Sequence, residues 1–134
     1  MLTRIKSAIF SEETIEFHVG LNVVLGDNNG SNSIGKSTLL MILDFIFGGN
    51  TYTSYNSDVI TNLGHHNFGS TFIFNNNEFH YVRGTEKPDV VYRSNKNYEN
   101  LEQITINDFT KELKLLYGIE SDQLTFRAAV SNFL

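Results

Sequence analysis

The sequence predicts a single α/β domain with a mixed β-sheet, and three observations lead to that prediction. Two short alternating segments at the start of the chain, residues 2–10 and 14–19, flank a polar SEE turn, which is typical of a β-hairpin. A β-branched run at residues 21–25 then precedes a polar loop that opens a helical repeat. A second pair of alternating segments follows, and capped helical stretches come after it. The 134 residues fit one such domain, residues 1–134.

The first half of the chain contains the predicted central strand and the longest predicted helix. Gly20 separates the hairpin from residues 21–25 (LNVVL), a run that suits a buried strand. Residues 26–34 form a polar loop. From Gly35 onward, apolar residues recur at three- and four-residue spacing, which predicts an amphipathic helix that ends at Gly48-Gly49.

The second half predicts further strands and then helices. Residues 70–74 and 78–83 flank the turn sequence NNN and predict a second antiparallel hairpin. Residues 90–93 and 104–106 predict two more short strands.

Two C-terminal helices follow these strands. Asn107 is a suitable N-cap for a helix over residues 108–117, and Gly118 is a suitable residue to end it. Ser121 can cap a second helix. Residues 50–67 show no dominant periodicity.

Composition excludes several functional classes. The net charge of −5 argues against an extended basic groove for nucleic acid. The absence of cysteine excludes disulfides and thiolate metal sites. The longest apolar stretch, residues 39–47, contains Asp44 and is too short to cross a membrane. Because the first twenty residues mix charges with short apolar runs, they do not form a signal peptide. We therefore expect a cytoplasmic protein without a membrane partner.

The loop before the long helix carries the phosphate-binding pattern G-x-x-x-x-G-K-[ST]. The predicted site consists of the residues that match this pattern and the one that follows it: Gly30, Ser31, Asn32, Ser33, Ile34, Gly35, Lys36, Ser37 and Thr38. Such a loop wraps a phosphate with backbone N–H groups, and glycine allows the unusual dihedral angles that this requires. The positive end of the following helix adds to the attraction. A strand before the pattern and a helix after it are the context that this motif needs.

The side chains at the end of the pattern have separate expected roles. Lys36 supplies a positive charge to the β- and γ-phosphates, and Ser37 offers its hydroxyl to Mg²⁺. Thr38 can bond the α-phosphate. The sequence therefore predicts ATP and Mg²⁺ as ligands, with Ser37 as the metal-contacting residue.

The segment TIEFHVGLNVVLG…NGSNSIGKSTLLMILDFIFGG resembles the opening of the SMC/RecN/RecF-type ABC ATPases. The matching positions are Gly20, Leu21, Asn22, Gly30, Asn32, Gly35, Lys36, Ser37 and Thr38. Two departures stand out. Ser33 replaces a glycine of the family's loop, and residues 26–29 lengthen the approach to it. The resemblance implies an ABC-type P-loop NTPase half-lobe and a homodimer that closes over ATP. It also implies DNA as a partner, which the charge does not favour.

Two motifs of a complete ATPase of this class are absent from the sequence. The family has a strand ending in Asp-Glu that serves Mg²⁺ and water, and it also has a Leu-Ser-Gly-Gly stretch. MILD (residues 41–44) falls inside the predicted helix, and LLYGIE (residues 115–120) reads as a helix end. No catalytic residue is assigned. We expect the N-terminal part of a longer ATPase, with its missing C-terminal half as a partner and no turnover by this chain alone.

Two other functions stay open at this point. A non-enzymatic nucleotide-binding interaction module would also lack the carboxylate motif. A P-loop kinase is disfavoured, because its alternating strands and helices differ from the two hairpins predicted here.

Several other residues have weaker signals. For His65-His66 a loop role is favoured over a metal site, because adjacent side chains diverge. His18 and His80 are expected at the surface, and Arg83 as a solvated residue at a strand end rather than a phosphate contact. Asp44 is expected to be structural. Aromatic residues of the later strands are expected in the core, namely Phe68, Phe72, Phe74, Phe79, Tyr81 and Tyr92.

Overall fold

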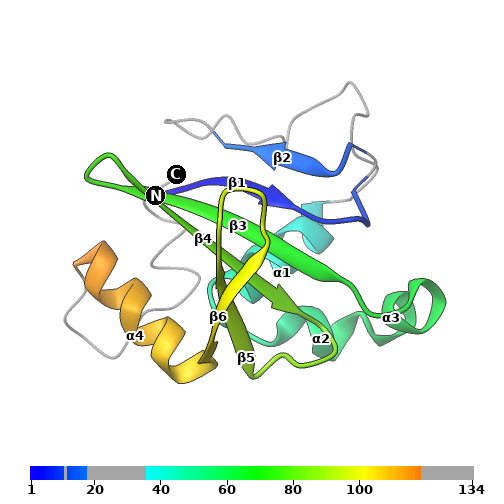
Figure 1. The fold of residues 1–134 in the computed structure, drawn as a ribbon. Helices are drawn as coiled ribbons and strands as arrows, with labels where there is room; N and C mark the ends of the chain where they lie inside the picture. The colour runs from blue at the N-terminus through cyan, green and yellow to red at the C-terminus, as the bar shows by residue number, and fades with distance from the viewer. Residues whose placement is uncertain (11, 18–35, 119–134) are drawn as a thin grey trace.

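The structure, a computed structural model, describes residues 1–10, 12–17 and 36–118. Helices cover one face of a β-sheet (Figure 1). In chain order the elements are β1 (Leu2–Lys6), β2 (Thr14–Glu16), α1 (Lys36–Ile46), α2 (Thr51–Tyr55), α3 (Ser57–Leu63), β3 (Asn67–Phe74), β4 (Asn77–Gly84), β5 (Val90–Ser94), β6 (Asn100–Thr105) and α4 (Ile106–Tyr117). The six strands lie in the order β2-β1-β3-β4-β5-β6.

Every strand pair in this sheet is antiparallel, so the prediction of a mixed sheet is wrong for the described residues. Short turns connect most neighbouring strands, and such turns reverse the chain. The segment between β2 and β3 contains the helices α1, α2 and α3. After it, β3 pairs with β1 and is again antiparallel to its neighbour. The predicted strand at residues 21–25 lies outside the described residues.

Both predicted hairpins are confirmed. In the first, Ile5 lies opposite Ile15, although both strands are shorter than predicted. In the second, Asn75 and Asn76 have φ angles of 51° and 65°. Two consecutive positive φ angles suit the tight turns that join twisted antiparallel strands, and asparagine tolerates them. The NNN sequence therefore sets the register of β3 against β4.

The predicted helices are confirmed where they are described. The helix α1 begins at Lys36, directly after the second glycine of the phosphate-binding pattern, and the chain turns at Gly48, where φ is 106°. The cap of α4 differs from the prediction, because the hydroxyl of Thr105, not a side chain at Asn107, accepts from the N–H of Asp108. Gly118 ends α4 in the left-handed conformation, as predicted. The unassigned segment forms the short helices α2 and α3.

The core lies between the helices and one face of the sheet. Buried aromatic rings join the layers: Phe45 of α1 contacts Phe68 of β3, and Tyr81 of β4 contacts Phe109 of α4. The predicted core position is confirmed for most of the aromatic residues, but Tyr92 lies outside the core cluster. No helix in the described ranges has the length and apolar content to cross a membrane.

The opposite face of the sheet, called the outer face below, is polar. Alternation along β3 and β4 sends Thr71 and His80 to this face while Phe72 and Tyr81 turn to the core. The connection between β5 and β6 crosses in front of it (Figure 1).

Candidate functional site

The predicted phosphate-binding residues fall at the start of α1. Gly30, Ser31, Asn32, Ser33, Ile34 and Gly35 lie outside the described residues. Lys36, Ser37 and Thr38 form the first turn of the helix. Ser37 is exposed, Thr38 is half-buried and Leu39 is buried. The helix therefore presents the hydroxyl of Ser37 to solvent just before it enters the core.

The start of α1 has the electrostatics of an anion site. The first four N–H groups of a helix have no partner within it, and the peptide dipoles add a partial positive charge there. No acidic residue occupies the first turn of α1 to oppose that charge. The helix has 11 residues, enough for several turns of aligned peptide dipoles.

The core holds α1 firmly along its length. Ile42 and Phe45 are fully buried, and Ile46 and Phe47 are nearly so. The ring of Phe45 packs edge-on against Phe68, whose ring in turn contacts Phe10 of the turn after β1. The helix thus packs against β3, and Phe68 links it to the turn after β1.

Arg83 donates hydrogen bonds at the carboxyl end of α1. This guanidinium donates from Nη1 to the carbonyl oxygens of Phe45 and Gly49, both at 2.7 Å. It also donates to the Pro88 carbonyl at 2.8 Å and to the side-chain oxygen of Asn50 at 3.1 Å. The residue is only 4% exposed. The expectation of a solvated Arg83 is therefore wrong, because the side chain is buried at the carboxyl end of α1.

Burial is the main influence on the pKa of Arg83. It lowers the pKa of the guanidinium to about 10, while the carboxylates of Asp44 and Asp89 raise it. The group stays protonated at neutral pH. Its position over the ring of Phe45, at 4.0 Å from the ring centroid, adds a cation–π contact.

Asp44 is structural, as predicted. Its carboxylate accepts from the backbone N–H of Thr51 at 3.2 Å and from the hydroxyl of the same residue at 2.6 Å. The carboxylate therefore provides an acceptor for the first backbone N–H group of α2. Asp44 is seven residues beyond Ser37, about 10 Å along the helix axis. This carboxylate cannot share a metal ion with the hydroxyl of Ser37.

The described residues offer limited metal chemistry. No group of three or more His, Asp or Glu side chains in the described ranges could hold a metal ion. The exposed hydroxyl of Ser37 suits a Mg²⁺ ion that takes its other ligands from phosphates and water, as Mg²⁺ usually does. The site therefore fits Mg²⁺ only together with a nucleotide.

The two adjacent histidines have structural roles, in agreement with the preference against a metal site. His66 is buried, and its Nε2 lies 2.7 Å from the hydroxyl of Tyr52, which is fully buried. Its Nδ1 lies 2.9 Å from the carbonyl oxygen of Gly64. Because that carbonyl can only accept, Nδ1 carries the proton and Nε2 accepts from Tyr52. His65 contacts the hydroxyl of Thr85.

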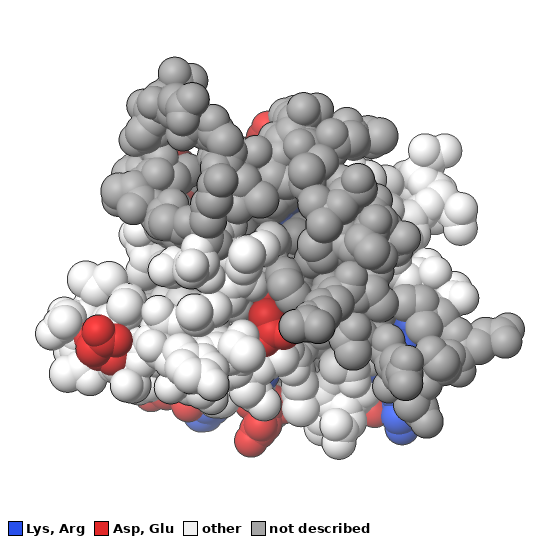
Figure 2. Space-filling model, turned by 180° about the vertical axis from the view of Figure 1, so that it is seen from behind, with Lys and Arg blue, Asp and Glu red and all other residues white. Residues whose placement is uncertain are grey.

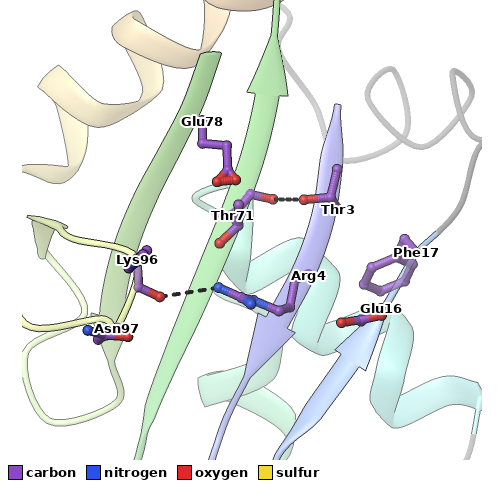
Figure 3. A pocket seen from close by; sticks show the side chains of 8 residues that line it. All are labelled: Thr3, Arg4, Glu16, Phe17, Thr71, Glu78, Lys96 and Asn97. Atoms are coloured by element: carbon purple, nitrogen blue, oxygen red, sulfur yellow. Dashed lines mark hydrogen bonds between the residues drawn. The ribbon is translucent and has the colours of Figure 1, made fainter. Parts of the chain in front are cut away.

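The outer face of the sheet carries two hollows. One, of about 400 Å³, is lined by Thr3, Arg4, Glu16, Phe17, Thr71, Glu78, Lys96 and Asn97 (Figure 3). A neighbouring hollow of about 460 Å³ lies between the turn after β1 and the β5–β6 connection. Arg4 and Thr71 point into the first hollow. Its walls carry both charge signs, so it favours neither an anion nor a cation.

His80 also belongs to the outer face, but it is not a surface residue as expected. Its side chain is 10% exposed, and its Nδ1 lies 2.8 Å from the hydroxyl of Thr71. His18 lies outside the described residues.

On the helix-covered face, Lys and Arg side chains of the described residues are sparse and scattered (Figure 2). This view gives no support to a nucleic-acid interface on that face.

Comparison with protein-family models, with curated proteins and with solved structures gives no match for this chain.

Sequence patterns could have revealed one of the missed residues. Arg83 alternates with Phe79 and Tyr81, so period-2 alternation already placed its side chain on the core face of β4. No comparable sequence pattern predicts the role of Tyr98, which lies in the β5–β6 connection and contacts Thr71. That contact joins residues 27 positions apart and arises only from tertiary structure.

Proposed function

We propose that this chain binds Mg-ATP through the loop formed by Gly30, Ser31, Asn32, Ser33, Ile34, Gly35, Lys36, Ser37 and Thr38. In this proposal it is the N-terminal half-lobe of an SMC/RecN/RecF-like ABC ATPase. The observation that carries the proposal is the start of α1 at Lys36, immediately after the second glycine of the pattern. A cytoplasmic location, where Mg-ATP is abundant, goes with it.

The surroundings of this helix start support the proposal in two ways. The exposed Ser37 and the lack of an acidic residue in the first turn leave that turn open to an anion. The packing of α1 on β3 and the hydrogen bond from Arg83 to its carboxyl end reduce the ordering that a phosphate would have to impose on the helix.

Calorimetric titration of the full chain with ATP in the presence of Mg²⁺ tests the proposal. Replacing Lys36 with Ala removes the charge expected on the phosphates, so we expect affinity to fall roughly tenfold or more, the value of a charge-assisted hydrogen bond. Ser37→Ala should weaken binding in Mg²⁺ and have little effect in excess chelator, because its hydroxyl is assigned to the metal.

Lys111→Ala is a matched control, because it removes the same charge from an exposed position on α4. Its affinity should equal that of the unmodified chain. Equal affinities for the unmodified chain and Lys36→Ala would contradict the proposal, provided that both proteins show the same circular dichroism spectrum.

A further inference from the structure

The connection between β5 and β6, residues 95–99, forms a compact strap over the outer face. The Asn95 side-chain oxygen accepts from the N–H groups of Asn97 at 2.9 Å and Glu99 at 3.1 Å. The N–H of Tyr98 donates to the carbonyl oxygen of Asn95 at 2.9 Å. Tyr98 itself has a φ of 61°, a conformation that non-glycine residues rarely adopt. The strap is therefore a small structured unit that presents the Tyr98 side chain to the sheet.

The Tyr98 side chain fastens the strap to the sheet. Its ring lies so close to Gly69 of β3 that a β-carbon there would be 2.7 Å from a ring carbon. Its hydroxyl lies 2.6 Å from the hydroxyl of Thr71 and accepts from Nε of Arg4 at 3.0 Å. A second nitrogen of Arg4 donates to the carbonyl oxygen of Lys96 at 3.2 Å. Only a residue without a β-carbon at position 69 allows this close approach.

These contacts form a chain of hydrogen bonds with a defined direction. Because a guanidinium can only donate, the Tyr98 oxygen accepts from Arg4 and its own proton is free to reach Thr71. The hydroxyl of Thr71 can then donate its single proton to Nδ1 of His80, 2.8 Å away. Both hydroxyl protons of the chain have an acceptor when His80 is neutral and carries its proton on Nε2, which lies 3.9 Å from a carboxylate oxygen of Glu78.

The opposite tautomer leaves one group without a partner. If Nδ1 of His80 donated to Thr71, one of the two hydroxyl protons, that of Thr71 or that of Tyr98, would have no acceptor among the described contacts. The unprotonated Nε2 would also face the carboxylate of Glu78, 3.9 Å away. Both effects favour the proton on Nε2.

From this geometry we propose that His80 is a pH-sensitive latch that releases the strap when its ring takes up a second proton. Protonation puts a hydrogen on Nδ1, so Thr71 must accept where it had donated. One of the two hydroxyl protons, that of Thr71 or that of Tyr98, is then left without an acceptor among the described contacts, which weakens the hold of the sheet on the strap. Since Asn97 of the strap lines both hollows of the outer face, release alters the shape of both.

The charged groups around His80 come from several elements. Arg4 reaches it from β1, Glu78 from β4 itself, and Tyr98 with Lys96 from the strap. Arg93 and Glu112 border a hollow beside His80 but pair with each other at 2.9 Å. The facing residues on β3 and β5, Thr71 and Ser94, do not titrate.

Burial and charge together decide when the latch titrates. Burial lowers the pKa of His80 below its usual 6.5, Glu78 raises it, and Arg4 lowers it further. Since the closed strap favours the neutral ring, its stability is complete above pH 6.5 and declines as the pH falls below that value.

Amide hydrogen exchange of the full chain between pH 8 and pH 5, corrected for intrinsic exchange rates, tests the latch. We expect protection at Asn97, Tyr98 and Glu99 to fall roughly fivefold as the pH drops, the effect of one hydroxyl proton left without an acceptor. Protection in the Asn75–Asn76 turn, which has no contact with His80, should stay constant. Nitrogen NMR of the His80 ring at pH 8 should show the proton on Nε2.

Variants separate the latch from a general effect of acid. His80→Asn keeps an acceptor near the Nδ1 position and cannot titrate, so protection of the strap should no longer depend on pH. Tyr98→Phe removes the hydroxyl and should lower protection at all pH values. His65→Gln should keep the pH dependence of the unmodified chain, because His65 contacts Thr85 and not the strap.

Three results would overturn the proposal. They are a proton on Nδ1 of neutral His80, strap protection that stays constant across the pH range in the unmodified chain, and a pH dependence that persists in His80→Asn. The NMR and exchange measurements on the unmodified chain decide the matter even if a variant fails to fold.

Discussion

At the scale of single residues, a buried cation secures the helix of the proposed nucleotide site. Arg83 donates four hydrogen bonds, three of them to backbone carbonyl oxygens. Two of those oxygens, from Phe45 and Gly49, belong to the carboxyl end of α1, where a positive charge is favoured. The planar, many-donor guanidinium suits this task better than the single ammonium of lysine.

Replacement of Arg83 by Met should therefore destabilise the fold. The change removes the Arg83 donor from the carbonyl oxygens of Gly49 and Pro88 and leaves that of Phe45 with only the N–H of Gly48, so we expect the free energy of unfolding to fall by about 2–4 kcal/mol. Urea denaturation followed by circular dichroism would measure the loss. Arg83→Lys should recover only part of it, because lysine cannot reach all of the acceptors.

Arg93→Met is the matched control for this prediction. Arg93 is 39% exposed on its side chain and pairs with Glu102 and Glu112. Surface pairs of this kind contribute little to stability, so we expect a loss below about 1 kcal/mol. A similar loss for Arg83→Met and Arg93→Met would mean that burial of the Arg83 guanidinium is not what secures α1.

At the scale of elements, turn and cap chemistry decides where strands and helices begin. The β3–β4 turn follows from asparagines that tolerate positive φ, and α4 begins where Thr105 caps it at the end of β6. Thr105 thus ends a strand and starts a helix. The prediction of Asn107 as the cap was wrong because Thr105 has the extended backbone, with a ψ of 158°, that a cap requires.

The contribution of the Thr105 cap to stability can be tested by substitution. Thr105→Val preserves shape and strand propensity but removes the hydroxyl that accepts from the N–H of Asp108 at 3.1 Å. We expect the free energy of unfolding to fall by about 1 kcal/mol, as for other lost N-caps. Thr105→Ser should retain most of the stability. Thermal or urea unfolding curves of Thr105→Val and the unmodified chain that coincide would exclude a role for this cap.

At the scale of the whole molecule, two of the described carboxylates already have structural partners. Asp44 caps α2, and Glu112 accepts from Tyr81 and Arg93. Phosphoryl transfer to water needs an oriented water molecule as well as a bound metal and a held phosphate. Asp44, about 10 Å from Ser37 along the helix axis, is too far away to orient water beside that hydroxyl.

We therefore expect this chain alone to bind Mg-ATP without hydrolysing it. Phosphate release by the purified chain should not exceed that of a buffer blank, while calorimetry still shows binding. Lys36→Ala distinguishes real turnover from a contaminating ATPase. Phosphate release that Lys36→Ala abolishes would show that a catalytic carboxylate exists within these 134 residues.

Local patterns were sufficient to predict both hairpins, α1, α4 and the core position of Phe68, Phe72 and Tyr81, because alternation, periodicity and turn residues act over a few positions. The proposed phosphate-binding loop comes from the sequence alone. Tertiary structure decided the all-antiparallel pairing of the described strands, the burial of Arg83, the low exposure of the His80 side chain, and the contact of Tyr98 with Thr71. These features join residues that are far apart in the chain, and no local pattern encodes which distant partner a side chain will meet.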